Sequence, residues 1–382
     1  MHVAEKSANR IPSLDLIRGL VMVLMVIDHV RVYSGQPAGG PSAGIFFTRW
    51  VTHFCAPAFV FLAGTSAFLY GQKLADKQAL SRFLLTRGLV LVVLELTVIR
   101  FFWTFQFDPS SALAGVIWML GWCMVLLAVL VRLPVKVVGL LGIVIVALQQ
   151  GFAMVPHALP QQLRAAVGWI WEFFYPADLE RLHHVAILYV LIPWIGVMAM
   201  GFAFGGIMVR PPAERSRLCI RIGLGATALF LLAGCISTAM LPAPQDAPPF
   251  LFRLLNQRKY PASQLFLLMT LGPTILLLGL VEGAKGQVAG VLSVFGRVPM
   301  FFYLLHILII HLAALLVTFV REGAVHPERY AHAPFAEVPA EFMWSLPLLY
   351  LVFFVVVGIL YFPCRWFAGV KARGANRWLS YV

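Results

Sequence analysis

Apolar stretches of about 20 residues recur from Ile11 to Phe367, and no long polar segment separates them. A helix of this length spans the hydrocarbon core of a bilayer. Only 12% of the residues are charged and 61% are hydrophobic, whereas soluble domains carry about 25% charged residues. The sequence therefore predicts an all-α integral membrane protein, a bundle of about ten transmembrane helices in one domain over residues 1–382.

The basic residues alternate between the loops that join the predicted spans. These spans cover residues 11–33, 46–70, 84–105, 111–131, 134–153, 186–208, 218–241, 263–281, 290–320 and 344–367. With the N-terminus inside, most of the 29 Lys and Arg residues fall on the cytoplasmic side. This positive-inside bias predicts that both termini are cytoplasmic. It also assigns the net charge of +13 to topology and contact with membrane lipids, not to nucleic acid.

Three loops on the predicted outer side are longer than the others, at 154–185, 242–261 and 321–341. Long loops often carry function, so we expect the outer face to be the working face. The first loop is rich in Trp and Phe, which is typical of an amphipathic segment at the membrane interface. Its His183-His184 doublet has no matched carboxylates, and the cysteines stand singly, so we predict no metal site.

Ionisable side chains within apolar spans are costly, and we treat each as a functional candidate. In span 11–33, eleven residues separate Arg18 from His29, which on a helix is about 20° of rotation and roughly 16 Å of rise. They share one face at opposite depths. This face suits a passage for a long, thin ligand with an anionic head at the inner end. The alternative is structural: Arg18 only pairs with Asp15, and His29 only bonds a neighbouring helix.

Further polar and aromatic side chains are predicted at the same outer depth as His29. They are His53, Arg100, Lys259, Tyr260 and His306. Each single His has a structural alternative, as a hydrogen-bonded core residue. Trp118 is a candidate pocket residue, with packing in the core or at an interface as its alternative.

These motifs resemble those of the heparan-alpha-glucosaminide N-acetyltransferase-like family of bacterial membrane proteins. More distantly, they are similar to the transmembrane acyltransferases that decorate surface polysaccharides. The segment Leu14-Asp15-Leu16-Ile17-Arg18-Gly19 followed by Asp28-His29 carries the resemblance first. Later blocks extend it over nearly the whole chain: 52–57 with 61–67, 116–118, 192–198, 259–263 with 267–273, and 295–299 with 302–306.

The resemblance implies an enzyme, an acyltransferase that moves an acyl group, typically acetyl, from cytoplasmic acetyl-CoA to a hydroxyl or amine across the membrane. Arg18 and Asp15 would serve the donor. His29 would act as general base or carry the acyl group transiently. Asp28 is grouped with it, although it points about 100° away and is expected to orient a group of another helix. Animal members lack this Asp-His pair, which keeps His53 as a second catalytic candidate.

On the acceptor side, the resemblance and the predicted depth together implicate several side chains. They are Lys259, Tyr260, Arg100, Trp118 and His306. The acceptor is expected to be an envelope glycan or a small metabolite, in the inner membrane of a bacterium. Acetyl-CoA is the one expected cofactor, without a metal, and a homodimer is left open.

Two other functional classes compete with the enzyme. A transporter or exporter would use the same buried charges as a permeation path, although the sequence lacks an internal repeat. A non-catalytic membrane scaffold would leave Arg18 and His29 unexplained. Transfer of label from acetyl-CoA to an acceptor separates the enzyme from both.

The charge alternation predicts the location of the C-terminus. A phosphatase reporter, active only outside the cytoplasm, should be inactive when fused after Val382, because the basic loops keep that end inside. The same reporter inserted in the predicted outer loop at 321–341 should be active and serves as the control. An active fusion at Val382 would reverse the predicted orientation.

Overall fold

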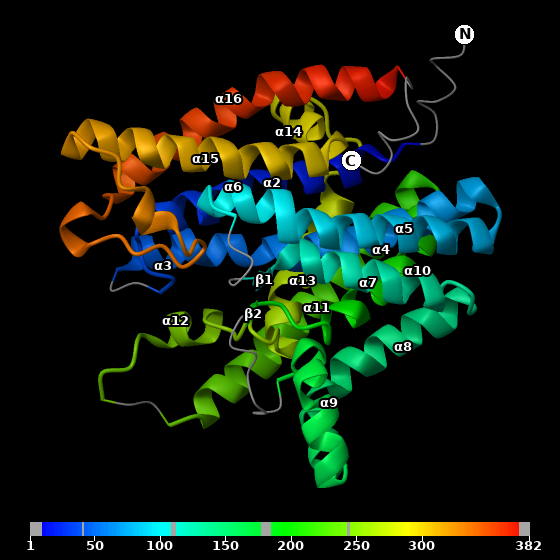
Figure 1. Cartoon of the computed structure of the whole chain (residues 1–382). Coiled ribbons are helices and arrows are strands. Elements are labelled where there is room, and N and C mark those ends of the chain that lie inside the picture. Colours follow the sequence, from blue (N-terminus) through cyan, green and yellow to red (C-terminus); the bar gives the residue numbers. More distant parts are fainter. Residues whose placement is uncertain (1–9, 40–41, 108–111, 177–184, 243–244, 374–382) are drawn as a thin grey trace.

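The computed structural model describes residues 10–39, 42–107, 112–176, 185–242 and 245–373, and these form a helical bundle (Figure 1). The α-helices are α2 (Pro12–Tyr33), α3 (Ala43–Trp50), α4 (Cys55–Leu74), α5 (Lys77–Leu94), α6 (Arg100–Thr104), α7 (Val116–Leu130), α8 (Val135–Leu148), α9 (Gln161–Phe174), α10 (Trp194–Met208), α11 (Pro212–Met240), α12 (Phe250–Leu255), α13 (Gln264–Leu280), α14 (Gln287–Arg297), α15 (Pro299–Glu322) and α16 (Leu346–Ala372). The 3₁₀ turns are η1 (Val51–Phe54), η3 (Gln149–Met154), η4 (Pro156–Ala158), η5 (Pro327–Tyr330) and η6 (Ala340–Phe342), and η2 (Glu95–Ile99) is a π-helix.

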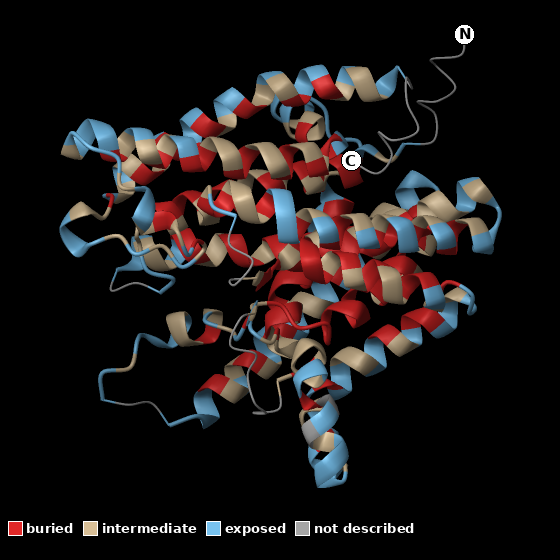
Figure 2. Cartoon of the chain, in the orientation of Figure 1, coloured by how far each residue is buried: buried red, intermediate tan, exposed pale blue. Residues whose placement is uncertain are grey.

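The prediction of an all-α protein is confirmed. Five helical segments of the described chain are long and apolar enough to cross a membrane, at 43–74, 135–154, 212–240, 299–322 and 346–372. Shorter apolar helices, α7, α10 and α13, lie between them in the sequence. Figure 2 shows exposed residues along the outer faces of α8, α11 and α16, where many are large apolar side chains that suit a lipid environment. The number of ten spans stays a prediction.

Three of the predicted spans contain a helix break or a strand in the structure. Span 290–320 is two helices, because Pro299 has no N–H to donate and disfavours helical backbone at the residue before it. In the predicted spans 111–131 and 186–208, the helices begin later than predicted, at Val116 and Trp194. The first residues of these spans form the strands β1 (Ala112–Ala114) and β2 (Val185–Ile187), which pair in parallel with Ala112 opposite Val185.

Helix α2 lies inside the bundle, with α14, α15 and α4 against it (Figure 1). Two glycines allow α2 and α14 to touch. A Cβ on Gly19 would lie 1.8 Å from the carbonyl oxygen of Leu292, and one on Gly296 would lie 1.8 Å from that of Asp15. Only glycine permits such a contact.

Helix α2 also gives names to the two ends of the bundle. We call them the Arg18 end and the His29 end.

A second glycine contact joins α4 to α10. A Cβ on Gly64 would lie 2.1 Å from the carbonyl oxygen of Met198, and one on Gly201 would lie 2.1 Å from that of Phe61. Gly64 is followed by Thr65 and Ser66, and such small residues allow helices to pack closely. The contact holds Ser66, on the same helix, close to the Arg18 end of α2.

An ionic contact ties three further elements together at the Arg18 end. Glu282, in the turn after α13, accepts a hydrogen bond of 2.9 Å from the hydroxyl of Ser13 and one from the guanidinium of Arg215 on α11. Burial favours the protonated carboxyl, but these two hydrogen bonds outweigh it, and the pKa of Glu282 is lowered. The carboxylate therefore stays ionised and links α2, α11 and α13.

The predicted amphipathic segment 154–185 contains α9, which stands away from the bundle (Figure 1). Leu163, Trp169 and Ile170 are exposed on this helix, whereas Phe173 packs with its ring 5.4 Å from that of Trp118. Helix α9 has exposed apolar side chains, as predicted for an interfacial helix. Its location at a membrane surface stays a prediction, and the His183-His184 doublet lies outside the described residues.

The α2–α14 contact generates a stability prediction. Gly296→Ala should lower the melting temperature of the purified protein markedly, because the new methyl group meets the backbone of α2 and overpacking costs about 1–3 kcal/mol. Gly290→Ala on the same helix is the matched control, since nothing lies within 4 Å of its added Cβ. Equal melting temperatures for the two variants would contradict the close packing.

Candidate active site

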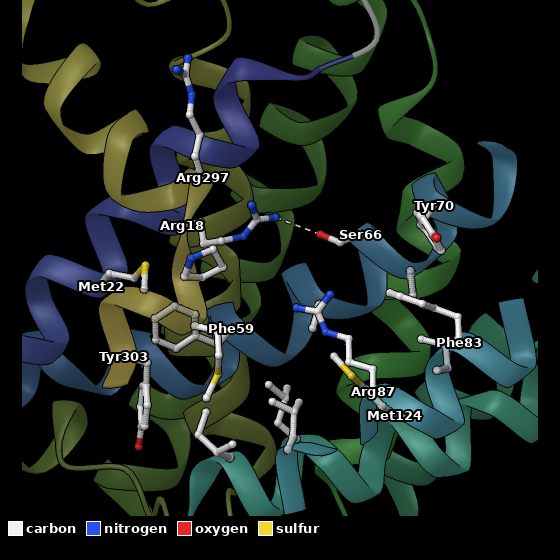
Figure 3. A pocket seen from close by; sticks show the side chains of 18 of the residues that line it. Arg18, Met22, Phe59, Ser66, Tyr70, Phe83, Arg87, Met124, Arg297 and Tyr303 are labelled. Carbon is white, nitrogen blue, oxygen red and sulfur yellow. Dashed lines mark hydrogen bonds between the residues drawn. The ribbon is translucent and has the colours of Figure 1, made fainter. Parts of the chain in front are cut away.

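A cavity of about 510 Å³ lies beside the Arg18 end of α2 (Figure 3). Its basic lining residues are Arg10, Arg18, Lys73, Arg87, Arg297 and Lys371. No acidic side chain lines it in the described part of the chain. The apolar wall includes Met22, Phe59, Leu91, Ile117 and Met124. Figure 3 shows Arg297 and Arg18 toward one end and Tyr303 toward the other, so the cavity is cationic at one end and apolar toward a tyrosine.

Arg18 is held in place by three hydrogen bonds. One terminal nitrogen donates to Asp15 Oδ1 at 3.1 Å and to the carbonyl oxygen of Gly296 at 3.0 Å, and the other donates to Ser66 Oγ at 2.9 Å (Figure 3). Asp15 also pairs with Arg10, at 2.8 Å. The pairing of Arg18 with Asp15 is therefore present. The alternative was that Arg18 only pairs with Asp15. The Arg18 guanidinium also lines the cavity, so pairing is not its only contact.

At the other end of α2, His29 forms a hydrogen bond with His306 of α15, with 2.7 Å between Nδ1 and Nε2. His306 Nδ1 lies 3.1 Å from the carbonyl oxygen of Phe302, which can only accept, so this nitrogen carries the proton. In a neutral His306, Nε2 then accepts from His29 Nδ1–H. A neutral His29 is left with its lone pair on Nε2, which makes no hydrogen bond to the described residues.

Aromatic rings surround this histidine pair. The ring of Trp103 lies 4.8 Å from that of His29, and the ring of Tyr303 lies 6.4 Å from His29 and 5.2 Å from His306. Tyr303 also lines the cavity, whereas neither histidine does. The face predicted to line a passage is therefore interrupted: Arg18 and Met22 face the cavity, and His29 lies behind Tyr303.

Asp28 contacts cations and not His29. Its Oδ1 lies 3.1 Å from a guanidinium nitrogen of Arg31, and its Oδ2 lies 3.5 Å from Arg49 of α3. Arg49 comes from another helix, so Asp28 contacts a group outside α2, and its orienting role stays a prediction. His53, in η1, is buried with its ring 5.4 Å from that of Phe266, and its Nδ1 has no hydrogen-bond partner among the described residues.

Lys259 and Tyr260 lie near Asp28 and Arg49, as the predicted depth suggested. The Lys259 ammonium lies 5.1 Å from the centre of the Tyr260 ring and 5.8 Å from that of Tyr189. The Tyr260 hydroxyl donates to that of Tyr189 at 3.4 Å. Two acceptor-side candidates therefore lie at the His29 end of α2, beside the charged groups of that end.

The remaining acceptor-side candidates are not in this group. Arg100 donates to the carbonyl oxygen of Ala333 at 2.6 Å, in the segment after α15. Trp118 is buried against Phe173 and Trp122 and is not part of the cavity lining. Among the residues described, no group of three or more His, Cys, Asp or Glu is placed to hold a metal ion.

Sequence reasoning missed Tyr303, Arg87 and Lys73. Tyr303 precedes His306 by three residues, so on a helix it shares a face with that histidine, and this spacing is a usable signal. Arg87 and Lys73 were assigned only to topology. Nothing in their local sequence separates a cation that faces a cavity from one that faces water.

Fold and site together define an all-α protein with helices long enough to cross a membrane and a cationic cavity whose Tyr303 contacts a histidine pair. The profile of the family described as "heparan-alpha-glucosaminide N-acetyltransferase, catalytic" matches residues 10–239, more than half of the chain. The protein belongs to this family, and membership implies acyltransferase activity. Among curated proteins, none matches the chain. The match covers Arg18, His29 and His53, whereas Lys259 and His306 lie beyond it.

Proposed function

We propose that the protein is a membrane-bound acetyltransferase that uses acetyl-CoA as donor and a hydroxyl or amine as acceptor. The acceptor is an envelope glycan or a small metabolite at the opposite face of the bacterial inner membrane. The cavity with its six basic side chains carries this proposal. Coenzyme A has phosphate groups at one end and a slender arm that ends in the thioester. Guanidinium and ammonium groups suit the phosphates, and the apolar wall suits the arm.

The cavity sets the direction in which the donor would bind. Its basic groups gather at the Arg18 end, where Arg10 is half-exposed at 51%. A donor with its phosphates there would bring the thioester toward Tyr303 and the histidine pair. In this orientation the Arg18 end faces the cytoplasm, where acetyl-CoA is available, and the acceptor reaches His29 from the other side.

His29 is the proposed general base. Its Nε2 lone pair takes the proton of the acceptor as the acceptor oxygen or nitrogen bonds to the acetyl carbon. The carbon–sulfur bond then breaks, and the proton passes from His29 to the departing thiolate. His306 accepts from His29 Nδ1–H throughout, so it fixes the tautomer and stabilises the imidazolium that forms. Attack by the same lone pair on the thioester would give a transient acyl-histidine. His53 stays the second candidate.

Acetyl transfer by the purified protein tests the function directly. Protein in lipid nanodiscs is mixed with acetyl-CoA labelled in the acetyl group and with glucosamine as a first acceptor. Label in the acceptor together with free thiol released in equal amount supports an acetyltransferase. Passage of a small solute into proteoliposomes without acetyl-CoA, with no acetyl transfer, would instead favour a transporter.

The cationic cavity predicts a donor-binding defect. Arg18→Ala and Arg87→Met should each raise the dissociation constant for acetyl-CoA by about 10- to 100-fold, because a charge-assisted hydrogen bond contributes about 1.5–3 kcal/mol. Asp15 keeps Arg10 as a partner, so the first variant should fold. Arg82→Met is the matched control, since Arg82 is exposed on α5 and does not line the cavity. Equal affinities in all three variants would place the donor elsewhere.

The histidine pair predicts a graded loss of turnover. His29→Ala should lower kcat by about 10²- to 10⁴-fold with acetyl-CoA affinity retained. His306→Leu should lower kcat less than His29→Ala does. The imidazole of His29 is still present as a base, but no acceptor then holds the proton on its Nδ1. His306→Gln should restore part of that loss, since its amide oxygen can accept from His29 Nδ1–H.

A buried histidine elsewhere on α15 controls for destabilisation. His311 lies 3.0 Å from the carbonyl oxygen of Phe102 and faces neither the cavity nor His29. His311→Leu should lower the melting temperature without a matching loss of kcat per folded molecule. A stable His29→Ala protein that transfers acetyl at the parent rate would remove His29 from the mechanism in favour of His53.

A further inference from the structure

A cluster of charged and polar groups lies at the His29 end of α2. It comprises Asp28, Arg31, Arg49, His53, Lys259 and Tyr260, which we call the Asp28 cluster. Tyr260 is exposed and Asp28 is partly buried, whereas the other four side chains are buried. Arg31, Arg49 and Lys259 are each at most 9% exposed. Burial of a charge is costly unless it is paired and hydrogen-bonded, so each of these cations needs an anion or an acceptor.

Two of the three cations have partners. Arg31 donates to Asp28 at 3.1 Å and to the carbonyl oxygen of Gln36 at 2.7 Å. Arg49 lies 3.5 Å from the same carboxylate and donates to the hydroxyl of Thr52 at 3.1 Å. The charged groups around His53 in the described chain are these three cations and one carboxylate, Asp28. A single negative charge is thus shared between two guanidinium groups.

Lys259 is the cation without a partner anion. It is 8% exposed, and its ammonium makes no hydrogen bond or ion pair with the residues that the structure describes. Its contacts are the faces of Tyr189 and Tyr260, and such cation–π contacts contribute about 0.5–2 kcal/mol. That is less than the several kcal/mol that a buried ion loses on leaving water. His53 Nδ1, close by, is fully buried and has no hydrogen-bond partner within the described part of the chain.

We propose that the Asp28 cluster binds an anionic group of the acceptor, a carboxylate or a phosphate ester, with Lys259 as its main contact. This rests on the proposed acetyl transfer and names the class of its acceptor. The anion would balance the excess positive charge, and His53 Nδ1–H can donate to it in the appropriate tautomer. Lys259, Arg31 and Arg49 all lie within electrostatic range of His29, so an acceptor anchored here would hold a nearby hydroxyl or amine close to His29 Nε2.

Paired acceptors test the charge preference. The parent protein should transfer acetyl to glucosamine 6-phosphate with a KM about 10- to 100-fold below that for glucosamine, and to glucuronate with a lower KM than for glucose. Lys259→Met should remove most of this preference by raising the KM values of the charged acceptors. Arg258→Met, the exposed neighbour with the same loss of charge, should keep it. Equal KM values for charged and neutral acceptors in the parent would overturn the inference while transfer itself stands.

A binding measurement keeps this site distinguishable from the enzymatic function. Inorganic phosphate should raise the melting temperature of the parent and of the Arg258→Met protein more than that of Lys259→Met, which keeps only the basic cavity at the Arg18 end as a phosphate site. If it does so and no acetyl transfer is found, the anion site stands and the proposed function fails. A lipid headgroup is the other possible source of a phosphate group at this site. Nanodiscs of phosphatidylcholine with and without phosphatidylglycerol test it. Stabilisation that depends on Lys259 and appears only with phosphatidylglycerol would make the occupant a lipid headgroup and overturn the acceptor assignment.

Discussion

The contact between α2 and α14 is the constraint on which the site depends. Gly19 and Gly296 bring two backbones within a distance that no side chain would allow. This contact delivers the carbonyl oxygen of Gly296 to Arg18 and so fixes one wall of the cavity. Since α14 continues through Pro299 into α15, the same contact determines where α15 begins. His306, two turns along α15, then meets His29.

The break at Pro299 lets one predicted span perform two tasks. A straight helix over 290–320 would pack along α2 at one angle only. With the break, α14 packs closely against the first turns of α2, and α15 turns along its second half. The Arg18 network and the histidine pair therefore use successive helices from one apolar stretch. Sequence hydrophobicity alone cannot reveal this division, because apolar residues continue on both sides of Pro299.

Helical spacing predicted that Arg18 and His29 share one face of a helix, and the apolar runs predicted an all-α fold. Both predictions depend only on residues close together in the sequence. The partner of His29 could not be predicted, since His306 is 277 positions away and no local rule pairs them. His306 was instead expected on the acceptor side. Arg87 was taken only as a topology signal for a similar reason: the cavity that it faces is formed by helices from distant parts of the chain.

Tyr303 has a consequence for the membrane as a whole. Tyr303 is 6% exposed, lines the cationic cavity and contacts His29 and His306, neither of which lines that cavity. For a protein in an energised bilayer, an open water-filled path past Arg18 and His29 would let protons and small ions leak and dissipate the gradient. A tyrosine ring in this position would keep such a path closed and preserve the electrical insulation of the membrane.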